Sequence, residues 1–158
     1  MVRIDPATSE ADLDAIRQLF HEYADSLGVD LNYQGFDREV RELPGDYAPP
    51  AGTLLLARRD QDIVGCDGVR PFDERIAEMK RLYVRPSGRG LGLGRALAEA
   101  AITFARDAGF ERMRLDTLPQ MQRAQELYRA LGFTSIDPYR FSAVPGTVYM
   151  ELVLGAKE

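Results

Sequence analysis

Three residue types are nearly or wholly missing from this chain of 158 residues, which has one cysteine, one histidine and no tryptophan. The lone Cys66 excludes an internal disulfide, and His21 has no second histidine with which to build a metal site or a catalytic triad. No apolar run approaches the roughly 20 residues of a membrane-spanning helix. The N-terminus reads directly as a strand, so we expect no signal peptide. These absences predict a cytoplasmic protein with no metal, no structural disulfide and no membrane partner.

Acidic residues are missing from one segment, although they dominate the chain as a whole. The formal net charge is −5, which argues against a general nucleic-acid partner. Between residues 79 and 98 there is no Asp or Glu, but there are five basic residues: Lys80, Arg81, Arg85, Arg89 and Arg95. Gly90, Gly92 and Gly94 alternate within the same segment. A cationic, glycine-rich turn in an acidic protein predicts an anion site.

The chain length and hydrophobic periodicity predict a single α/β domain over residues 1–158, with elements in the order βααβββαβαββ. Ser9, with Asp12 three residues later, predicts a capped helix that ends at Gly28. A second, shorter helix is expected from about Phe36. The remaining elements are expected as strands at 2–5, 53–58, 62–70, 76–84, 112–117, 133–136 and 147–154, and as helices from Leu93 to Ala108 and at 121–131.

A glycine loop that opens a helix has several uses. Its backbone N–H groups can converge on a phosphate, because glycine has no Cβ to block the approach and tolerates positive φ. No Lys-Ser or Lys-Thr follows these glycines, so the loop is not a Walker loop. A dinucleotide fingerprint, Gly-x-Gly-x-x-Gly, needs a third glycine three residues after the second. This chain has Arg95 three residues after Gly92 and Leu97 three residues after Gly94, so the loop does not match. A turn without a ligand stays open on the pattern alone.

A family resemblance narrows the choice. The segment from Val84 to Leu97, VRPSGRGLGLGRAL, resembles the acetyl-CoA signature of the GNAT superfamily of acetyltransferases, Arg/Gln-x-x-Gly-x-Gly/Ala. Three other segments resemble the family in the same order, namely AEMKRLYV from Ala77, MRLD from Met113 and AQELYRALGF from Ala124. The resemblance implies a GNAT fold, which is a mixed, mostly antiparallel sheet of about seven strands with about four helices and a splayed central strand pair.

The resemblance also implies where acetyl-CoA binds as co-substrate. The backbone of Leu82, Tyr83 and Val84 is expected to pair with the pantetheine arm, and an N–H near Leu82 to stabilise the oxyanion. The pyrophosphate is expected on the loop made of Arg89, Gly90, Leu91, Gly92, Leu93, Gly94 and Arg95. The family commonly has an asparagine after the fifth strand, where this chain has Leu118-Pro-Gln-Met121, so details there are expected to differ.

Two catalytic residues follow from the same resemblance. Tyr128 matches the tyrosine that protonates the departing thiolate, although its place on the apolar stripe of a helix is equally explained by packing. Glu78 matches a strand glutamate that removes a proton from the amine through water. Glu78 is equally explained as an exposed strand residue paired with Arg81 or another basic residue near Lys80. Cys66 is expected to be a buried small hydrophobe rather than an acyl carrier.

The acceptor is expected to be a primary amine of a small molecule or peptide, acetylated by direct attack in a ternary complex. The alternative is a catalytically weak CoA-binding regulatory protein, and a nucleotide-binding enzyme is disfavoured by the glycine spacing. Homodimer formation stays open. The early helices and the last connection contain residues that could line an acceptor pocket: Tyr33, Phe36, Asp37, Tyr139 and Phe141.

Overall fold

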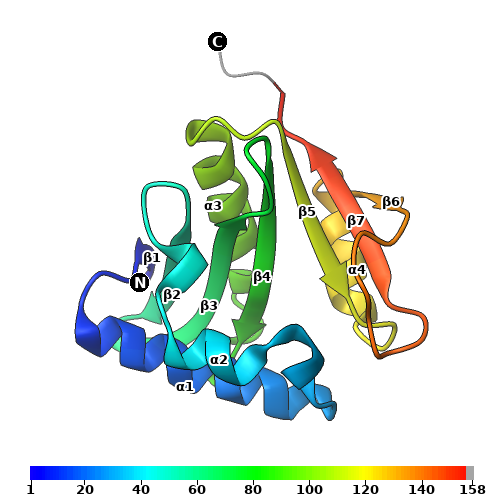
Figure 1. Cartoon of the computed structure of the whole chain (residues 1–158). Helices are drawn as coiled ribbons and strands as arrows, with labels where there is room; N and C mark the ends of the chain where they lie inside the picture. Colours follow the sequence, from blue (N-terminus) through cyan, green and yellow to red (C-terminus); the bar gives the residue numbers. More distant parts are fainter. Residues whose placement is uncertain (156–158) are drawn as a thin grey trace.

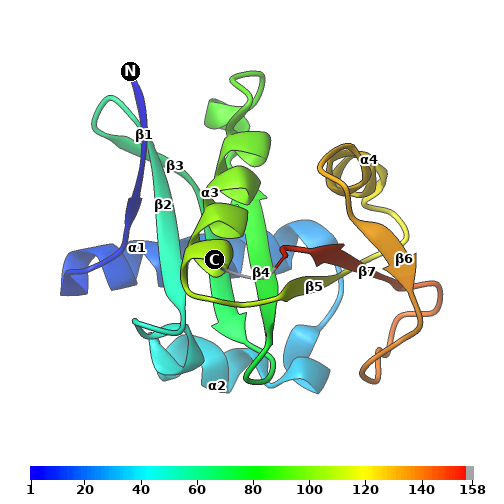
Figure 2. The same ribbon diagram turned by 90° about the horizontal axis from the view of Figure 1, so that it is seen from above.

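The computed structural model describes residues 1–155 and contains one seven-stranded sheet in the order β1-β2-β3-β4-β5-β7-β6 (Figures 1 and 2). All neighbouring strands are antiparallel except the pair β4–β5. The strands are β1 (Val2–Pro6), β2 (Thr53–Arg59), β3 (Asp62–Pro71), β4 (Ile76–Val84), β5 (Arg112–Thr117), β6 (Thr134–Ile136) and β7 (Val148–Val153). The α-helices are α1 (Glu10–Leu27), α2 (Phe36–Arg41), α3 (Leu93–Asp107) and α4 (Gln122–Ala130). Three 3-10 turns lie between them, at Leu31–Gln34, Gly45–Tyr47 and Pro86–Gly88.

This architecture confirms the predicted mixed α/β sheet and its element order. The capping box is formed as predicted, with the Ser9 side chain accepting from the Asp12 amide, and α1 stops at Gly28 with φ of 67°. Helix α4 is one residue shorter at each end than predicted. Within residues 1–155, no helix has the length and apolar character needed to cross a membrane.

Helices cover both faces of the sheet and make two separate cores (Figure 2). On one face, α3 and α4 pack through residues such as Leu97, Ala101 and Tyr128 onto the strands, which forms the α3-side core. On the other face, α1 and α2 pack through Phe20 and Phe36, which forms the α1-side core. Strand β4 runs between the two cores, so its alternate side chains enter one or the other.

The central strands β4 and β5 separate soon after they meet. Only Ile76, Ala77 and Glu78 of β4 pair with β5, opposite residues 112–114. Beyond these three pairs the strands diverge and leave a wedge between them (Figure 1). The predicted splayed pair is therefore present.

A β-bulge reshapes β4 where the wedge opens. Lys80 pairs with Gly68 and Tyr83 with Cys66, so β4 has one more residue than β3 over this stretch. The extra residue leaves Arg81 with a backbone φ of 70°, which residues other than glycine rarely adopt. As a result Lys80 and Arg81 both reach the α1 face, where each donates to the side-chain amide oxygen, Oε1, of Gln34. Leu82 turns to the α3-side core.

Candidate active site

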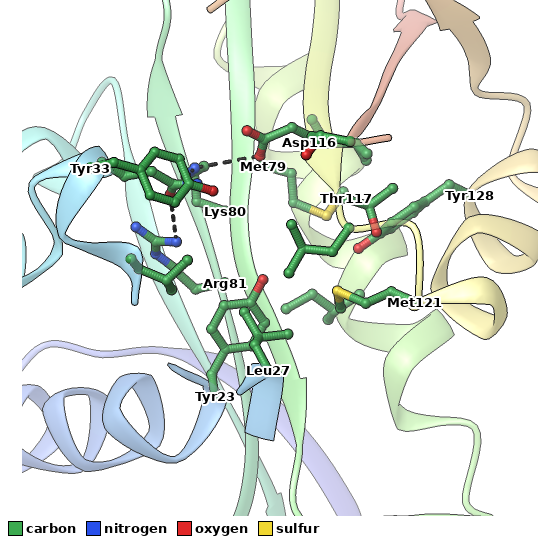
Figure 3. Close-up of a pocket in the computed structure, with 16 residues that line it drawn as sticks. Tyr23, Leu27, Tyr33, Met79, Lys80, Arg81, Asp116, Thr117, Met121 and Tyr128 are labelled. Carbon is green, nitrogen blue, oxygen red and sulfur yellow. Dashed lines mark hydrogen bonds and ion pairs between the residues drawn. The ribbon is translucent and has the colours of Figure 1, made fainter. Parts of the chain in front are cut away.

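Two connected hollows follow the wedge between β4 and β5. The outer groove lies over the β4 end, the glycine loop and α4. The inner pocket lies between η1 (Leu31–Gln34), the β4 bulge and the end of β5 (Figure 3). Both hollows are lined by the same four side chains: Tyr23, Leu82, Met121 and Tyr128. The two hollows therefore adjoin at these side chains.

The outer groove contains nearly all the residues predicted to bind the cofactor. They come from β4 and from the glycine loop: Leu82, Tyr83, Val84, Arg89, Gly90, Gly92, Leu93 and Gly94. Leu91 and Arg95 are the two that do not line it. Leu91 is exposed to solvent, and the Arg95 guanidinium lies 2.9 Å from Glu99 on the next turn of α3. Arg123 and Ala124 of α4 complete the opposite wall.

The glycine loop has the geometry of an anion cradle. Gly90 and Gly92 have φ of 81° and 70°, and a Cβ on either would meet no protein atom within 4 Å. Positive φ, rather than crowding within the protein, is thus what requires glycine here. Gly92 caps α3 without any side-chain hydrogen bond, and the first turn of α3 has no acidic residue. The first-turn N–H groups and the positive end of the helix dipole are therefore available to a phosphate.

The charge run is less cationic in the fold than in the sequence. Four of its five basic side chains are paired with carboxylates: Lys80 with Asp116, Arg81 with Glu39, Arg85 with Glu22 and Arg95 with Glu99. Of these five residues, only Arg89 has no ion pair within residues 1–155. The unpaired charge lies on the rim of the outer groove, beside the glycine loop.

Tyr128 projects from α4 into the wedge. Its ring is 6% exposed and packs edge-on against Phe133 at 5.7 Å between ring centroids. Its hydroxyl has no hydrogen-bond partner in the described part of the chain. Figure 3 shows it pointing into the space that the Tyr23 hydroxyl enters from the opposite side. Burial, and then the charge of Asp67, raises the pKa of Tyr128 well above 10, so the hydroxyl stays protonated and can donate.

The inner pocket contains polar groups that were not predicted from the sequence. The Lys80 ammonium lies 3.5 Å from a carboxylate oxygen of Asp116 across the wedge and donates to Gln34 at 3.1 Å. Burial, and then the charge of Arg81, lowers the pKa of Lys80 to about 8. Thr117 beside Asp116 is 5% exposed, and its hydroxyl finds no partner within residues 1–155. The only hint in the sequence was the polar pair Glu78 and Lys80 in a central strand.

Glu78 lies in neither hollow. It is 1% exposed, so the alternative that it is an exposed strand residue is wrong. Its two carboxylate oxygens accept from Arg70 at 3.0 Å, Tyr139 at 2.8 Å and Arg140 at 3.0 Å. Burial opposes ionisation, but the charges of Lys80 and the two arginines outweigh it and hold the pKa of Glu78 below its ordinary value. The carboxylate therefore ties the segment before β7 to β4.

The five residues predicted for an acceptor pocket do not all come together. Tyr33 lines the inner pocket and packs edge-on against Phe141, which is 74% exposed. Tyr139 is engaged with Glu78. Phe36 is buried in the α1-side core beneath the Arg81 guanidinium, and Asp37 points to solvent from α2. The sequence alone does not show which face of the short helix α2 is buried.

Cys66 is fully buried on β3 opposite the bulge. Its thiol donates to the Arg81 carbonyl oxygen at 3.4 Å. Burial, and then the charge of Asp67, raises the pKa of Cys66 well above 9, which disfavours the nucleophilic thiolate. The prediction of a buried small hydrophobe is confirmed.

Comparison with known proteins agrees with this geometry. Residues 13–133 match the model of the acetyltransferase (GNAT) family. An uncharacterized N-acetyltransferase of Schizosaccharomyces pombe is 41% identical over 143 residues, which cover 89% of this chain and 88% of that protein. An IAA acetyltransferase of Azospirillum brasilense is 34% identical over 140 residues, covering 87% and 90%.

Solved structures show the same fold. An acetyltransferase from Streptococcus agalactiae superposes with a TM-score of 0.79 at 21% identity, covering 96% of this chain and 98% of that one. A putative acetyltransferase of Salmonella typhimurium, solved with its cofactor acetyl-CoA, gives a TM-score of 0.70 at 22% identity and covers 100% and 96%. With the splayed strands, the glycine cradle and the family match over most of its length, the chain belongs to the GNAT family of acetyltransferases.

Proposed function

We propose that this N-acetyltransferase moves an acetyl group from acetyl-CoA to a primary amine of a small molecule or peptide, by direct attack in a ternary complex. The observation that carries the proposal is that the glycine cradle at the α3 N-terminus opens into the same wedge as the Tyr128 hydroxyl. One site thus combines a seat for a phosphorylated group with a proton donor beside a second, polar pocket.

The residues of the outer groove suit the two ends of acetyl-CoA. The N–H groups from Arg89 to Gly94 would hold the pyrophosphate, with the unpaired Arg89 adding charge. The backbone of Leu82–Val84 would hold the pantetheine arm and direct the thioester toward the bulge. Acetyl-CoA supplies the acetyl group in activated form. Binding its remote end fixes the reacting end, which is how such contacts lower the barrier to reaction.

The reaction requires two proton movements. As the amine nitrogen bonds to the acetyl carbon, the carbon–sulfur bond breaks, the amine loses a proton and the departing thiolate gains one. Tyr128 is the proposed donor to sulfur, because its hydroxyl is protonated, has no hydrogen-bond partner within residues 1–155 and points into the wedge. A backbone N–H near Leu82 is the proposed donor to the oxyanion.

Glu78 stays a prediction as the base that takes the proton from the amine. Its lowered pKa and its three donors make it a weak acceptor, and they favour a role in positioning the segment that contains Tyr139 and Arg140. Glu78→Gln separates the two roles. Loss of a base removes the acidic limb of the profile of kcat against pH, whereas loss of positioning raises KM and lowers stability with the profile intact.

Release of CoA thiol with a panel of primary amines tests the proposal. We expect at least one amine to accelerate thiol release well above the hydrolysis background, with one N-acetyl product formed per thiol. Acetyl-CoA that binds but is not turned over with any amine would contradict transfer and would favour a regulatory CoA-binding protein. Equal binding of NAD or ATP would contradict the cofactor assignment.

A further inference from the structure

We infer that the acceptor is an amino carboxylate, a molecule with both an amine and a carboxylate, and that Lys80 and Asp116 in the inner pocket recognise its two charged groups. This inference rests on the proposed acetyl transfer. It goes further because it assigns a substrate class and two residues that the family resemblance did not identify.

The position of the pair is the first argument. The last backbone pair between β4 and β5 joins Glu78 and Arg114. Lys80 and Asp116 each lie two residues further on, so their side chains face each other where the strands part (Figure 3). The inner pocket containing them shares Tyr128 and Leu82 with the outer groove. An acceptor that reaches the proposed thioester position from the inner pocket therefore lies beside this pair.

Unused hydrogen-bonding capacity is the second argument. The 3.5 Å between Lys80 and Asp116 is longer than the usual N–H···O distance of about 2.7–3.2 Å. In the described part of the chain, Asp116 accepts no hydrogen bond and the Lys80 ammonium donates only the one to Gln34. The Thr117 hydroxyl has no partner there either. Buried polar groups are nearly always satisfied, so the unpartnered Thr117 hydroxyl beside the long Lys80–Asp116 contact indicates that a polar ligand completes this pocket.

The burial of the pair makes a purely structural role a poor explanation. The side chains of Lys80 and Asp116 are 2% and 10% exposed. A buried ion pair loses much hydration, and apolar side chains of the same size often stabilise a fold equally well or better. A long, partly bonded pair contributes less still. A role in recognising a ligand accounts for both its position and its incomplete contacts.

The balance of charge identifies the ligand. Arg81 also lines the inner pocket, but its guanidinium is engaged by Glu39 and Gln34. Lys80 and Asp116 form an ion pair with each other at 3.5 Å, so a ligand beside them meets one cation and one anion. A ligand with only one charge would satisfy one partner and leave the other buried beside it, which is costly. An amino carboxylate satisfies both, its amine beside Asp116 and its carboxylate beside Lys80. Because burial and Arg81 lower the pKa of Lys80 to about 8, a second anion would stabilise its charged form.

Matched acceptors test the inference on the intact protein. Each set consists of an L-amino acid, its methylamide and the corresponding amine without the carboxyl group, for alanine, methionine, phenylalanine and glutamate. We expect kcat/KM for the amino acid to exceed that for its methylamide by roughly 10- to 100-fold in at least one set, the range of a hydrogen bond to a charged group. If the methylamide or the amine reacts as well as the amino acid in every set, the inference is overturned.

Lys80→Met tests the proposed residue. The ratio of kcat/KM between amino acid and methylamide, both measured on one preparation, does not depend on the folded fraction. We expect this ratio to fall to about 1, a loss of roughly 10- to 100-fold. The matched control Arg38→Met removes an exposed cation whose one ion pair within residues 1–155 is with Glu42, and it should keep the wild-type ratio. An unchanged ratio in Lys80→Met overturns the assignment.

Calorimetric binding of the same amino acids and methylamides to the protein with CoA separates this inference from the proposed function. Amino-acid binding that weakens in Lys80→Met, without turnover of any amine, would support the inference and contradict acetyl transfer. Turnover of amines that lack a carboxylate, with no preference for amino acids, would support acetyl transfer and overturn the inference. Amino acids that bind no better than their methylamides would overturn it as well.

Discussion

Removing the carboxylate of Glu39 should destabilise the β4 bulge and with it the wedge. Arg81 holds the strained position of the bulge, and its side chain is 2% exposed. Glu39 of α2 accepts from its Nε at 3.1 Å and from its Nη2 at 3.2 Å. Glu39→Gln keeps the size of the side chain but replaces one acceptor oxygen by an N–H₂ donor. A buried guanidinium then faces a donor and has no counter-charge.

The expected cost is large compared with that of a surface pair. Breaking a buried ion pair by removing one partner costs about 3–5 kcal/mol, against a total stability of about 5–15 kcal/mol for typical proteins. For a chain of this size, about 2–4 °C per kcal/mol gives a fall in melting temperature of roughly 6–20 °C. Glu42→Gln, which removes an exposed i,i+4 partner of Arg38, is the matched control and should cost about 0.3–0.5 kcal/mol.

Urea unfolding followed by circular dichroism measures both variants, with acetyl-CoA calorimetry on the folded proteins. We expect Glu39→Gln to lose several-fold more unfolding free energy than Glu42→Gln and to bind acetyl-CoA more weakly, because the bulge that directs Leu82 is loosened. Equal destabilisation by the two substitutions would refute the reasoning that this buried pair holds the bulge.

Four further substitutions test separate features of the molecule, and one of them, Gly109→Ala, is a control. Tyr128→Phe should lower kcat roughly 10- to 100-fold and leave acetyl-CoA affinity and melting temperature nearly unchanged, because the hydroxyl has no partner in the described chain. An unchanged kcat would remove Tyr128 from the reaction. Gly92→Ala, at φ of 70°, should cost about 1–2 kcal/mol of stability and weaken acetyl-CoA binding. Gly109→Ala, at φ of 95° beyond the far end of α3, should cost stability alone, and equal affinities in the two would contradict the cradle. Burial raises the pKa of Asp67 well above 3.8, so wild-type stability falls as pH rises from 3.8 through the folded pKa. Asp67→Asn lacks this loss, so in urea unfolding its stability relative to wild type should be greater at pH 7 than at pH 4. A stability difference that does not change with pH would contradict a buried carboxyl whose ionisation costs stability.

The sequence predicted those features that depend on neighbouring residues. The capping box at Ser9 and Asp12 spans three positions, and the glycine loop carries its conformation within six. Strand β4 was predicted with its observed ends, since its apolar pattern stops at Pro86. The splayed pair was implied by the family resemblance rather than by any local signal.

The features that were missed depend on contacts between distant segments. Lys80 meets Gln34 across 46 positions of the chain, and Arg81 meets Glu39 across 42. The bulge arises from the registers of β3 and β4 together, and no pattern in β4 alone predicts positive φ at Arg81. The same holds for Glu78, whose environment comes from Arg140 on a connection 62 residues away. Residue type therefore indicated that these side chains were unusual, but only the fold shows what they contact.

Hydrogen–deuterium exchange with and without acetyl-CoA tests the central claim most directly, namely that the wedge and its glycine cradle bind this molecule. We expect slower exchange at the backbone amides of 82–84 and 89–94 when acetyl-CoA is added, with no comparable change in β1 or α2. Unchanged exchange in both segments, or protection only elsewhere in the chain, would contradict binding in the wedge.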